Sequence, residues 1–393
     1  MISDTVSLVL AVPMPAKGGD STAMDLSSAL VDRVDAVFAD MEKPQHPGAA
    51  LLAIDHGEIV CRKCYGLADV ETQRPVTPDS SFYLASISKP FVAMAIMMLV
   101  HEGRLRYDDR LPAFFPQLPS WGGEISVRHL LHHTSGLPGY VQFFSSSAGI
   151  PEWTREINGV TNEAVLERAM NLAGPEFPVG AQYAYSGMGY VLLAMIVAAV
   201  SHQSCAGFLK ARIFDPLGMK NTVAYDQSRP VRHRLAHGYL QGKDRFERWD
   251  YPMLTVGDGG LFSTLDDLFL WDQALNTERL VSKAALEQAF TSGKTNDGTP
   301  VDYGFGWYTN VSAFVTAAER EQLRSLGADL RYVAHGGGCV AYFNYIIRLL
   351  DTERTILVLT NCGPITPASE LHRGGIPSPR IRAHQVAEIL FGG

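Results

Sequence analysis

The sequence predicts an α+β fold in which an antiparallel sheet is flanked by helices and a large, mostly helical region is inserted between its strands. Three observations lead to this prediction. The chain opens with helical and then strand-like periodicity, the longest apolar stretches in its middle have the length of buried helices, and strand-like segments return only from Gly304 onward. The simplest architecture pairs both ends of the chain in one sheet and leaves a cleft beside the inserted region.

The first part of the sheet region is predicted to span residues 25–85. Ser27–Lys43 carries apolar residues at the spacing of one helix face. Gly48–Ile54 and Glu58–Tyr65 are typical of strands, and the Asp55-His56-Gly57 turn between them predicts a hairpin. Residues 1–24 are interpreted as a disordered leader, because their short apolar stretch has no basic segment before it.

The mainly helical region is predicted to span residues 86–254. It contains the two longest apolar runs, Phe91–Val100 and Tyr190–Val200, which are too short to cross a bilayer and suit buried helices. Polar loops rich in proline and glycine separate the predicted helices. These helices are expected over Ser86–Glu102, Val127–His132, Asn162–Leu172 and Met188–His202.

The second part of the sheet region is predicted to span residues 255–393. Its apolar segments either alternate or run without interruption, and Asp351–Arg354 makes a turn between the last two of them. Strands are expected over Gly304–Tyr308, Arg331–His335, Ala341–Leu349 and Thr355–Asn361, and a final helix over about Pro379–Leu390.

Composition narrows the classes of partner. The 393 residues are 46% hydrophobic, which is enough to build a large core, and 19% charged. The net charge is −8 and no block of lysine or arginine stands out, which argues against nucleic acid because phosphate binding needs a basic face. We therefore expect a protein without a membrane span that acts on small molecules.

The five cysteines do not form an evident metal site. Cys61 and Cys64 have the spacing of a metal or redox pair, but in a strand an offset of three places the two side chains on opposite faces. No second pair and no histidine cluster completes a zinc site. An odd, scattered set fits free thiols in a reducing compartment. The expected location is the cytoplasm, with a periplasmic or secreted protein not excluded.

The candidate chemistry begins at Ser86-Ile87-Ser88-Lys89, at the start of an apolar helix. Residues three apart share a helix face, so the Lys89 amine can reach the Ser86 hydroxyl. Burial lowers the pKa of a lysine towards that of a base, and a helix N-terminus favours negative charge near Ser86. The pattern indicates a serine nucleophile with its own base. Because such a string arises by chance about once in a chain of this length, partners elsewhere must support it.

Two later stretches supply such partners. Tyr185-Ser186-Gly187 precedes an apolar helix, and His335-Gly336-Gly337-Gly338 follows a predicted strand. In order and spacing, the three motifs resemble those of the serine β-lactamase-like hydrolases. That group holds class C β-lactamases, D-alanyl-D-alanine carboxypeptidases, aminopeptidases, and the esterases and acyltransferases built on the same scaffold.

Framework stretches extend the resemblance over roughly Leu30 to Asn361. They are Leu130–Pro138, Gly257–Thr264 and Tyr303–Trp307. Each stretch alone is weak evidence for the family, but several of them in the right order are specific to it. The resemblance implies a β-lactamase/transpeptidase-like fold, with the active site in the cleft between the sheet and the helical region.

The resemblance also implies roles for individual residues. Ser86 would attack a carbonyl and form an acyl-enzyme, with Lys89 or Tyr185 as the base and Tyr185 passing the proton to the leaving group. The backbone N–H groups of Ser86 and Gly338 would form the oxyanion hole. No cofactor or metal is implied. The expected substrate-binding residues are Tyr140, Asp258, His335, Gly336 and Gly337.

Two departures from the family pattern bear on specificity. Gly187 stands where the family has asparagine, which removes an amide that contacts the lysine and the substrate. His335 replaces a lysine, and a neutral imidazole anchors a substrate carboxylate poorly at pH 7. Both changes favour esters and other acyl donors without a carboxylate. The predicted function is therefore an esterase or acyltransferase.

Several alternatives stay open or are disfavoured. A D-aminopeptidase, amidase or carboxypeptidase is the main alternative, with weak β-lactamase side activity, and a non-catalytic family member is less favoured because Ser86, Lys89 and Tyr185 are all present. An α/β-hydrolase is rejected, because its His-Gly-Gly-Gly motif precedes the nucleophile and this chain lacks a Gly-x-Ser-x-Gly elbow. His129 and His133 have the spacing of zinc ligands but lack a glutamate between them. The natural substrate, the acyl acceptor and the oligomeric state do not follow from the sequence.

Overall fold

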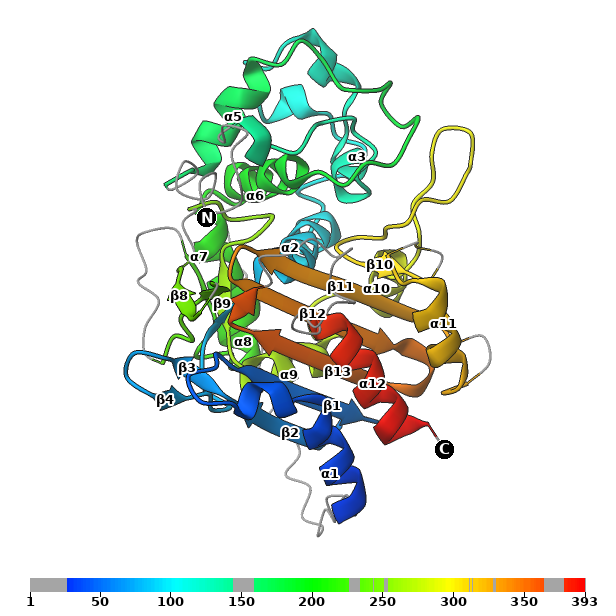
Figure 1. The fold of residues 1–393 in the computed structure, drawn as a ribbon. Helices are drawn as coiled ribbons and strands as arrows, with labels where there is room; N and C mark the ends of the chain where they lie inside the picture. Colours follow the sequence, from blue (N-terminus) through cyan, green and yellow to red (C-terminus); the bar gives the residue numbers. More distant parts are fainter. Residues whose placement is uncertain are drawn as a thin grey trace, which may run out of the picture.

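The computed structural model describes residues 27–143, 159–225, 234–242, 244–250, 254–310, 312, 314–327, 330–363 and 378–392. The leader predicted for residues 1–24 lies outside them. Figure 1 shows an antiparallel sheet with helices on both of its faces, and a mostly helical region above it. The predicted α+β class is confirmed.

The central sheet joins the two ends of the chain. Its six strands have the order β10-β11-β12-β13-β1-β2, and β1 pairs antiparallel with β13 so that Ala49 faces Thr360. This is the pairing that the sequence predicts. The strands are β1 (Ala49–Asp55), β2 (Glu58–Tyr65), β10 (Tyr308–Thr309), β11 (Tyr332–Cys339), β12 (Tyr342–Leu349) and β13 (Arg354–Thr360).

Alternation along the strands builds a core on each face of the sheet. Ala49, Leu51 and Ala53 of β1 pack in the core beneath α1 (Ser28–Val37) and α12 (Pro379–Phe391), which lie in front of the sheet in Figure 1. The residues between them, Ala50, Leu52 and Ile54, join the larger core behind the sheet. Cys61 and Cys64 likewise contact opposite cores, as their offset in β2 predicts.

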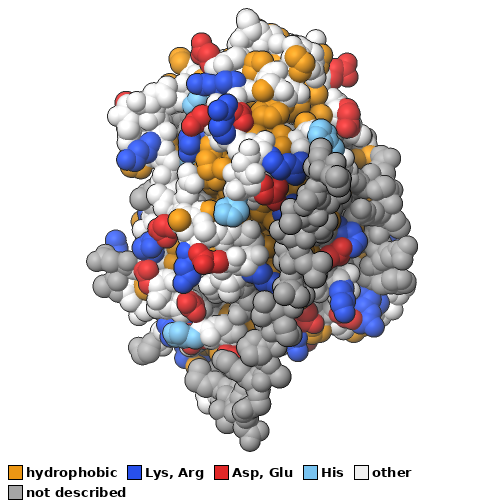
Figure 2. Space-filling view, turned by 180° about the vertical axis from the view of Figure 1, so that it is seen from behind, with side chains coloured by type: hydrophobic (Ala, Val, Ile, Leu, Met, Phe, Trp, Pro, Cys, Tyr) orange, Lys and Arg blue, Asp and Glu red, His pale blue; other side chains and the backbone are white. Residues whose placement is uncertain are grey.

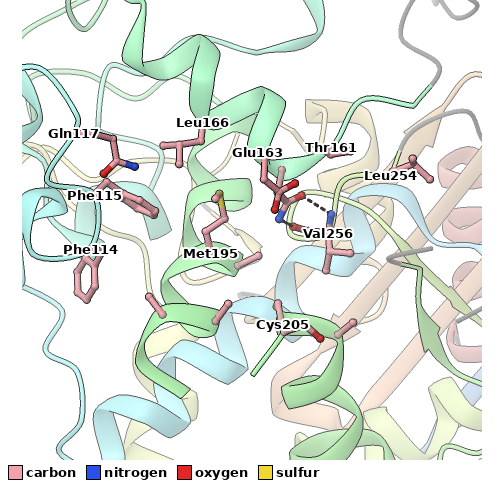
Figure 3. A pocket seen from close by; sticks show the side chains of 16 residues that line it. Phe114, Phe115, Gln117, Thr161, Glu163, Leu166, Met195, Cys205, Leu254 and Val256 are labelled. Atoms are coloured by element: carbon pink, nitrogen blue, oxygen red, sulfur yellow. Dashed lines mark hydrogen bonds between the residues drawn. The ribbon is translucent and has the colours of Figure 1, made fainter. Parts of the chain in front are cut away.

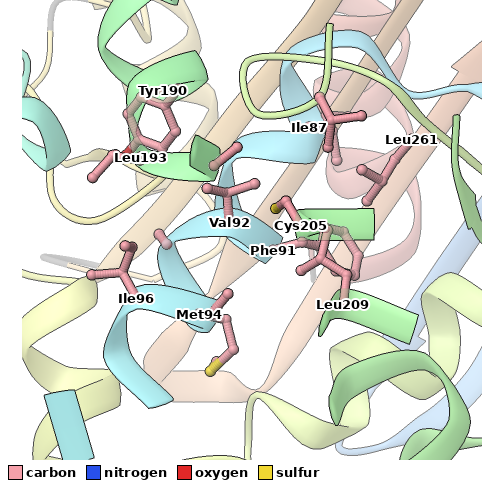
Figure 4. Close-up of a cluster of buried hydrophobic side chains, with 14 of the residues drawn as sticks. Ile87, Phe91, Val92, Met94, Ile96, Tyr190, Leu193, Cys205, Leu209 and Leu261 are labelled. Atoms are coloured by element: carbon pink, nitrogen blue, oxygen red, sulfur yellow. The ribbon is translucent and has the colours of Figure 1, made fainter. Parts of the chain in front are cut away.

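The larger core centres on two apolar helices. α2 (Lys89–His101) is buried from Lys89 to Leu99, and it packs against α6 (Gly187–Ser201). Figure 4 shows Phe91, Val92 and Ile96 of α2 within this core, together with Tyr190 and Leu193 of α6. A helix that is apolar on all sides is stable only when it is surrounded, and here the sheet and the other helices surround it.

The remaining helices cover this core and the edges of the sheet. They are α3 (Val127–Leu131), α5 (Asn162–Met170), α7 (Cys205–Leu209), α8 (Asp215–Leu217), α9 (Leu265–Ala274), α10 (Lys283–Ala289) and α11 (Ala317–Arg324), with a π-helical turn over Lys210–Phe214. Short 3-10 turns are η1 (Ala39–Glu42), η2 (Ala85–Ser88), η3 (Leu111–Ala113), η4 (Ser120–Glu124), η5 (Val141–Phe143) and η7 (Leu350–Thr352).

The described residues also form three small sheets. They have the orders β5-β9-β6, β14-β7-β8 and β3-β4. Their strands are β3 (Leu67–Asp69), β4 (Arg74–Pro75), β5 (Phe82–Tyr83), β6 (Val223–Ala224), β7 (Tyr239–Gln241), β8 (Phe246–Arg248), β9 (Leu261–Ser263) and β14 (Cys362–Gly363).

Two predicted strand boundaries were wrong. The strand expected to end at His335 continues through the three glycines to Cys339, because Gly336, Gly337 and Gly338 keep their pairing with β12. The strand expected over Gly304–Tyr308 is reduced to Tyr308–Thr309. Gly306 has a φ of +84°, a left-handed conformation that turns the chain before the strand begins.

The surface agrees with the composition. On the face in Figure 2, lysine and arginine side chains are scattered among acidic ones and form no continuous basic face. Within the described residues, no single helix is both long and apolar enough to cross a membrane, although α6 and the segment Cys205–Leu217 pass that test together as a pair bent by 74°.

Candidate active site

The turn that carries Ser86 is held between a small sheet and the core helix α2. The N–H of Leu84 donates to the carbonyl of Leu261 in β9 at 2.8 Å, and the Ser88 hydroxyl accepts from the Leu261 N–H at 3.2 Å. Ala85 has a φ of +48°, a conformation that costs free energy for any residue other than glycine. This sharp turn places Ser86 one turn before Lys89, at the start of the helix.

Lys89 contacts Ser86 as the spacing predicts. Its Nζ lies 3.0 Å from the Ser86 Oγ and also donates to the backbone carbonyl of Asp258 at 2.7 Å. Lys89 is 1% exposed. Burial lowers the pKa of its amine to about 8, although the negative charge of Asp258 acts in the opposite direction. Near neutral pH, part of the lysine is therefore the free amine that can accept a proton.

Tyr185 stands over the same pair. The Lys89 Nζ lies 4.9 Å from the centre of its ring, and its hydroxyl forms a hydrogen bond with Ser86. Burial of the phenol raises the pKa of Tyr185 above its usual value, and the bond to Ser86 opposes that rise. Because 37% of the residue stays exposed, solvent moderates this shift. Tyr185 is a protonated phenol at neutral pH and can pass a proton between groups at the Ser86 hydroxyl.

His133 holds the segment that carries Tyr185. The N–H of Ala184 donates to the His133 carbonyl at 2.9 Å, and the N–H of Ser186 donates to the His133 Nδ1 at 3.1 Å. The imidazole also lies against the Tyr185 ring, with 4.4 Å between ring centres. Hydrogen bonds on both sides of Tyr185 therefore fix its backbone, and His133 has a structural use that differs from zinc ligation.

Asp258 and Tyr140 form a polar pair on another wall of the site. The Tyr140 hydroxyl donates to the Asp258 Oδ2 at 3.0 Å and lies 3.1 Å from the Thr255 Oγ1. Burial raises the pKa of the Asp258 carboxyl, and the charge of Lys89 lowers it. Both of these predicted substrate-binding residues line the cavity that Ser86 also lines, and Tyr140 is engaged through its hydroxyl.

Gly187 leaves the space that this pair occupies. A Cβ added at Gly187 would lie 2.9 Å from the Asp258 Oδ2 and 3.1 Å from the Tyr140 ring. Real Cβ atoms rarely come so close to other atoms, so a larger residue at position 187 requires the pair to shift. The departure from asparagine is therefore matched by a carboxylate that fills the same region.

His335 is buried behind the site. It is 1% exposed, its Nε2 accepts a hydrogen bond from the Tyr303 hydroxyl at 2.7 Å, and its Nδ1 donates to the Gly336 carbonyl at 2.6 Å. Burial lowers the pKa of His335 to about 3, with the charge of Lys89 acting in the same direction. The imidazole is neutral at pH 7 and both of its nitrogens are engaged, so it offers no anchor for a carboxylate.

The glycine run brings β11 close to the Ser86 turn. A Cβ at Gly337 would lie 2.2 Å from the Leu84 carbonyl oxygen, whereas one at Gly338 would meet only the Phe343 ring at 3.4 Å. Gly337 therefore permits the contact between strand and turn. Gly338 borders the cavity opposite Ser86, where its N–H is the predicted second oxyanion donor. Gly336 and Gly337 are not among the described residues that line the cavity.

These groups surround a cavity of about 330 Å³. Four residues of its lining were not predicted from the sequence. Cys339, Val340 and Phe343 follow the glycine motif, and Tyr83 precedes the nucleophile. Position next to these motifs was the only available signal. The described lining consists of Tyr83, Ala85, Ser86, Lys89, Gly139, Tyr140, Val141, Tyr185, Gly187, Asp258, Gly338, Cys339, Val340 and Phe343.

A larger cavity of about 550 Å³ lies elsewhere, between α5, α6 and the segment around Phe115 (Figure 3). Met195 and Leu166 contribute apolar surface, and Glu163 is the only carboxylate among its described lining residues. It holds no serine beside a lysine. Its described lining residues include no lysine that could act as the base of a serine.

Comparison with known proteins identifies the family of this chain. A family model described as Beta-lactamase matches residues 34–374. Penicillin-binding protein 4* of Bacillus subtilis (strain 168) is 35% identical over 81% of this chain and 69% of that protein. Protein flp of Staphylococcus aureus (strain MW2) is 27% identical over 71% of this chain, and the match spans only 56% of that protein.

Solved structures show the same fold. The octameric penicillin-binding protein homologue from Pyrococcus abyssi is 26% identical with a TM-score of 0.73, over 93% of this chain and 77% of that one. D-amino acid amidase from Ochrobactrum anthropi SV3, complexed with D-phenylalanine, is 22% identical with a TM-score of 0.71, over 92% and 99% of the two chains. EstCE1, a hydrolase with promiscuous acyltransferase activity, is 21% identical with a TM-score of 0.70, over 93% and 99%.

The β-lactamase/transpeptidase-like fold that the resemblance implied is thereby confirmed. The family match covers strands from both ends of the central sheet and the helical region between them. The chain belongs to the β-lactamase family, as a serine hydrolase of the superfamily that β-lactamases share with penicillin-binding proteins.

Proposed function

We propose that the protein hydrolyses carboxylic esters, or transfers their acyl groups, through an acyl-enzyme on Ser86. The observation that carries the proposal is the 3.0 Å contact between the Lys89 Nζ and the Ser86 Oγ in a cavity whose described lining residues provide no second cation for a substrate carboxylate. Lys89 is the only lysine or arginine among the described lining residues, and it is committed to Ser86.

The charged groups in the cavity favour an ester as substrate over a β-lactam or a peptide with a free C-terminus. His335 is neutral at pH 7 and is hydrogen-bonded at both nitrogens. The Asp258 carboxylate lines the same cavity and repels a second carboxylate. An acyl donor that ends in a carboxylate would therefore be repelled by Asp258 and would lack the lysine that the family pattern provides at position 335.

In the proposed first step, the Ser86 Oγ attacks the ester carbonyl carbon and its proton moves to the Lys89 amine. Lys89 is a better base than Tyr185 here, because the pKa of the amine is lowered to about 8 while that of the phenol is raised. The oxyanion accepts hydrogen bonds from the N–H groups of Ser86 and Gly338.

In the second step, the tetrahedral intermediate collapses and breaks the bond to the alcohol oxygen, which takes a proton through Tyr185. The acyl group stays on Ser86. Water, or an alcohol in acyl transfer, then attacks the acyl-enzyme carbonyl, gives its proton to the same base and releases the Ser86 hydroxyl. Atoms and protons balance without a cofactor, and the enzyme returns to its starting state.

The test is hydrolysis of p-nitrophenyl butyrate by the wild type and by Ser86→Ala, with nitrocefin in parallel. We expect ester cleavage by the wild type, a loss of at least about a hundredfold in the variant, and slow or no nitrocefin turnover. Undiminished activity in Ser86→Ala would refute the nucleophile. If nitrocefin were much the better substrate, the argument from Gly187 and His335 would be wrong.

A further inference from the structure

One oxygen of Asp258 has no partner. The Oδ2 accepts from the Tyr140 hydroxyl, but the Oδ1 is buried and has no hydrogen bond within the described part of the chain. A carboxylate oxygen that is removed from water without a donor costs free energy. Because Asp258 lines the cavity, a bound molecule that donates to this carboxylate would supply the missing hydrogen bond.

Lys89 does not use this carboxylate. Its Nζ donates to the backbone carbonyl of Asp258, and no ion pair within 4.0 Å joins it to the Asp258 side chain among the described residues. The two charges share the cavity without pairing. When Lys89 is the neutral base of the proposed first step, the Asp258 carboxylate is the one charged side chain among the described residues that line the cavity.

The wall around Asp258 is aromatic. Tyr83, Tyr140, Tyr185 and Phe343 are among the described residues that line the cavity. The face of an aromatic ring attracts a cation, and it does so more strongly where water is displaced. A carboxylate oxygen without a donor, a negative charge and aromatic faces together describe a site for a small organic cation.

We propose that the cavity binds a positively charged amino group on the acyl part of the substrate, held by the Asp258 carboxylate, so that the preferred esters are those of amino acids. This inference rests on the proposed function, because it assigns the acyl group that Ser86 accepts. The lack of a side chain at Gly187 leaves room for this carboxylate, since a Cβ there would lie 2.9 Å from the Asp258 Oδ2.

The test compares two esters of nearly equal shape. In alanine ethyl ester an ammonium group takes the place of one methyl group of ethyl isobutyrate, and both alanine enantiomers are used. The readout is the ratio of kcat/KM for the alanine ester to that for the isobutyrate, in the wild type and in Asp258→Asn. Comparing the ratio between two enzymes cancels the intrinsic reactivity of the esters and any general loss of activity.

We expect the ratio to fall by at least about tenfold in Asp258→Asn for at least one enantiomer, as for the loss of one charge-assisted hydrogen bond. The matched control is Asp267→Asn, a carboxylate bonded to Thr222 at 2.7 Å that does not line the cavity. Its ratio should equal that of the wild type. An equal ratio in all three enzymes overturns the inference.

A second measurement needs no variant. Propylammonium should inhibit hydrolysis of ethyl isobutyrate by the wild type competitively and more strongly than 1-propanol, and equal inhibition would overturn the inference.

Failure of the proposed function is distinguishable from failure of this inference, because neither ester would then be cleaved in a Ser86-dependent manner. Ser86-dependent cleavage without a difference between the two inhibitors or in the ratios rejects the ammonium site alone.

Discussion

Replacement of Gly337 by alanine tests how strictly the strand β11 positions the nucleophile. The added Cβ would lie 2.2 Å from the Leu84 carbonyl oxygen, and real Cβ atoms stay about 3.0 Å or more from such an atom, so strand and turn must separate by about 0.8 Å. Leu84 lies two residues before Ser86, and backbone atoms cannot rotate away as a flexible side chain can. A misplacement of about 1 Å costs roughly a hundredfold in rate.

We therefore expect Gly337→Ala to lower kcat for p-nitrophenyl butyrate by about a hundredfold, with a smaller change in KM. The matched control is Gly336→Ala in the same strand, whose Cβ would meet only the outer end of the Phe314 ring at 3.0 Å. This close contact is with the end of a side chain and not with backbone, so the loss of kcat should be below about tenfold.

Thermal unfolding of both variants separates the two causes of lost activity. Overpacking costs about 1–3 kcal/mol, so Gly337→Ala should remain folded at 25 °C with a lowered Tm. If a folded Gly337→Ala retained wild-type kcat, the link between the strand contact and the placement of Ser86 would be refuted.

Three further predictions follow from the site and the core. First, kcat/KM for the neutral ester should rise with pH to a plateau above about 8, because Lys89 must lose its proton to act as base; a pH–rate profile that falls over this range would assign catalysis to the charged lysine. Second, His133→Leu should lower kcat by about ten- to a hundredfold with little change in KM, because Tyr185 loses its support; steady-state kinetics checks this, and an unchanged kcat argues against it. Third, the Asp272 side chain is 2% exposed and forms an ion pair with Arg348 at 2.7 Å. Arg348→Met removes this partner and leaves Asp272 as a buried unpaired charge. Urea denaturation should show a loss of about 3–5 kcal/mol, with partial recovery when Asp272→Leu is added, and a wild-type midpoint would contradict this.

The parts of the fold that could be predicted are those governed by local periodicity. α2 and α6 are apolar over their length, and β1 alternates between two cores, so their existence and approximate ends follow from spacing alone. The strand β11 was predicted too short, because glycine carries no strand propensity of its own. Its pairing with β12 across Gly336 to Gly338 extends it.

The candidate site likewise has a part that the sequence predicts and a part that it does not. The contact between Ser86 and Lys89 follows from their spacing at the start of a helix, and the structure places the two side chains 3.0 Å apart. The predicted use of His335 in substrate binding finds no support in the geometry. Its hydrogen bonds to Tyr303 and Gly336 come from the tertiary fold, and no sequence pattern around His335 indicates them.

The sequence by itself determined the class of fold and predicted the contact between the proposed nucleophile and its base, because one helical turn sets the distance between them. Only the tertiary structure showed that the Asp258 carboxylate lines the same cavity as Ser86. Asp258 lies 169 residues from Lys89 along the chain. Its carboxylate reaches the cavity because Tyr140 donates to one oxygen and because Gly187 leaves room for both. Such a placement depends on packing between distant segments, which neither composition nor periodicity specifies.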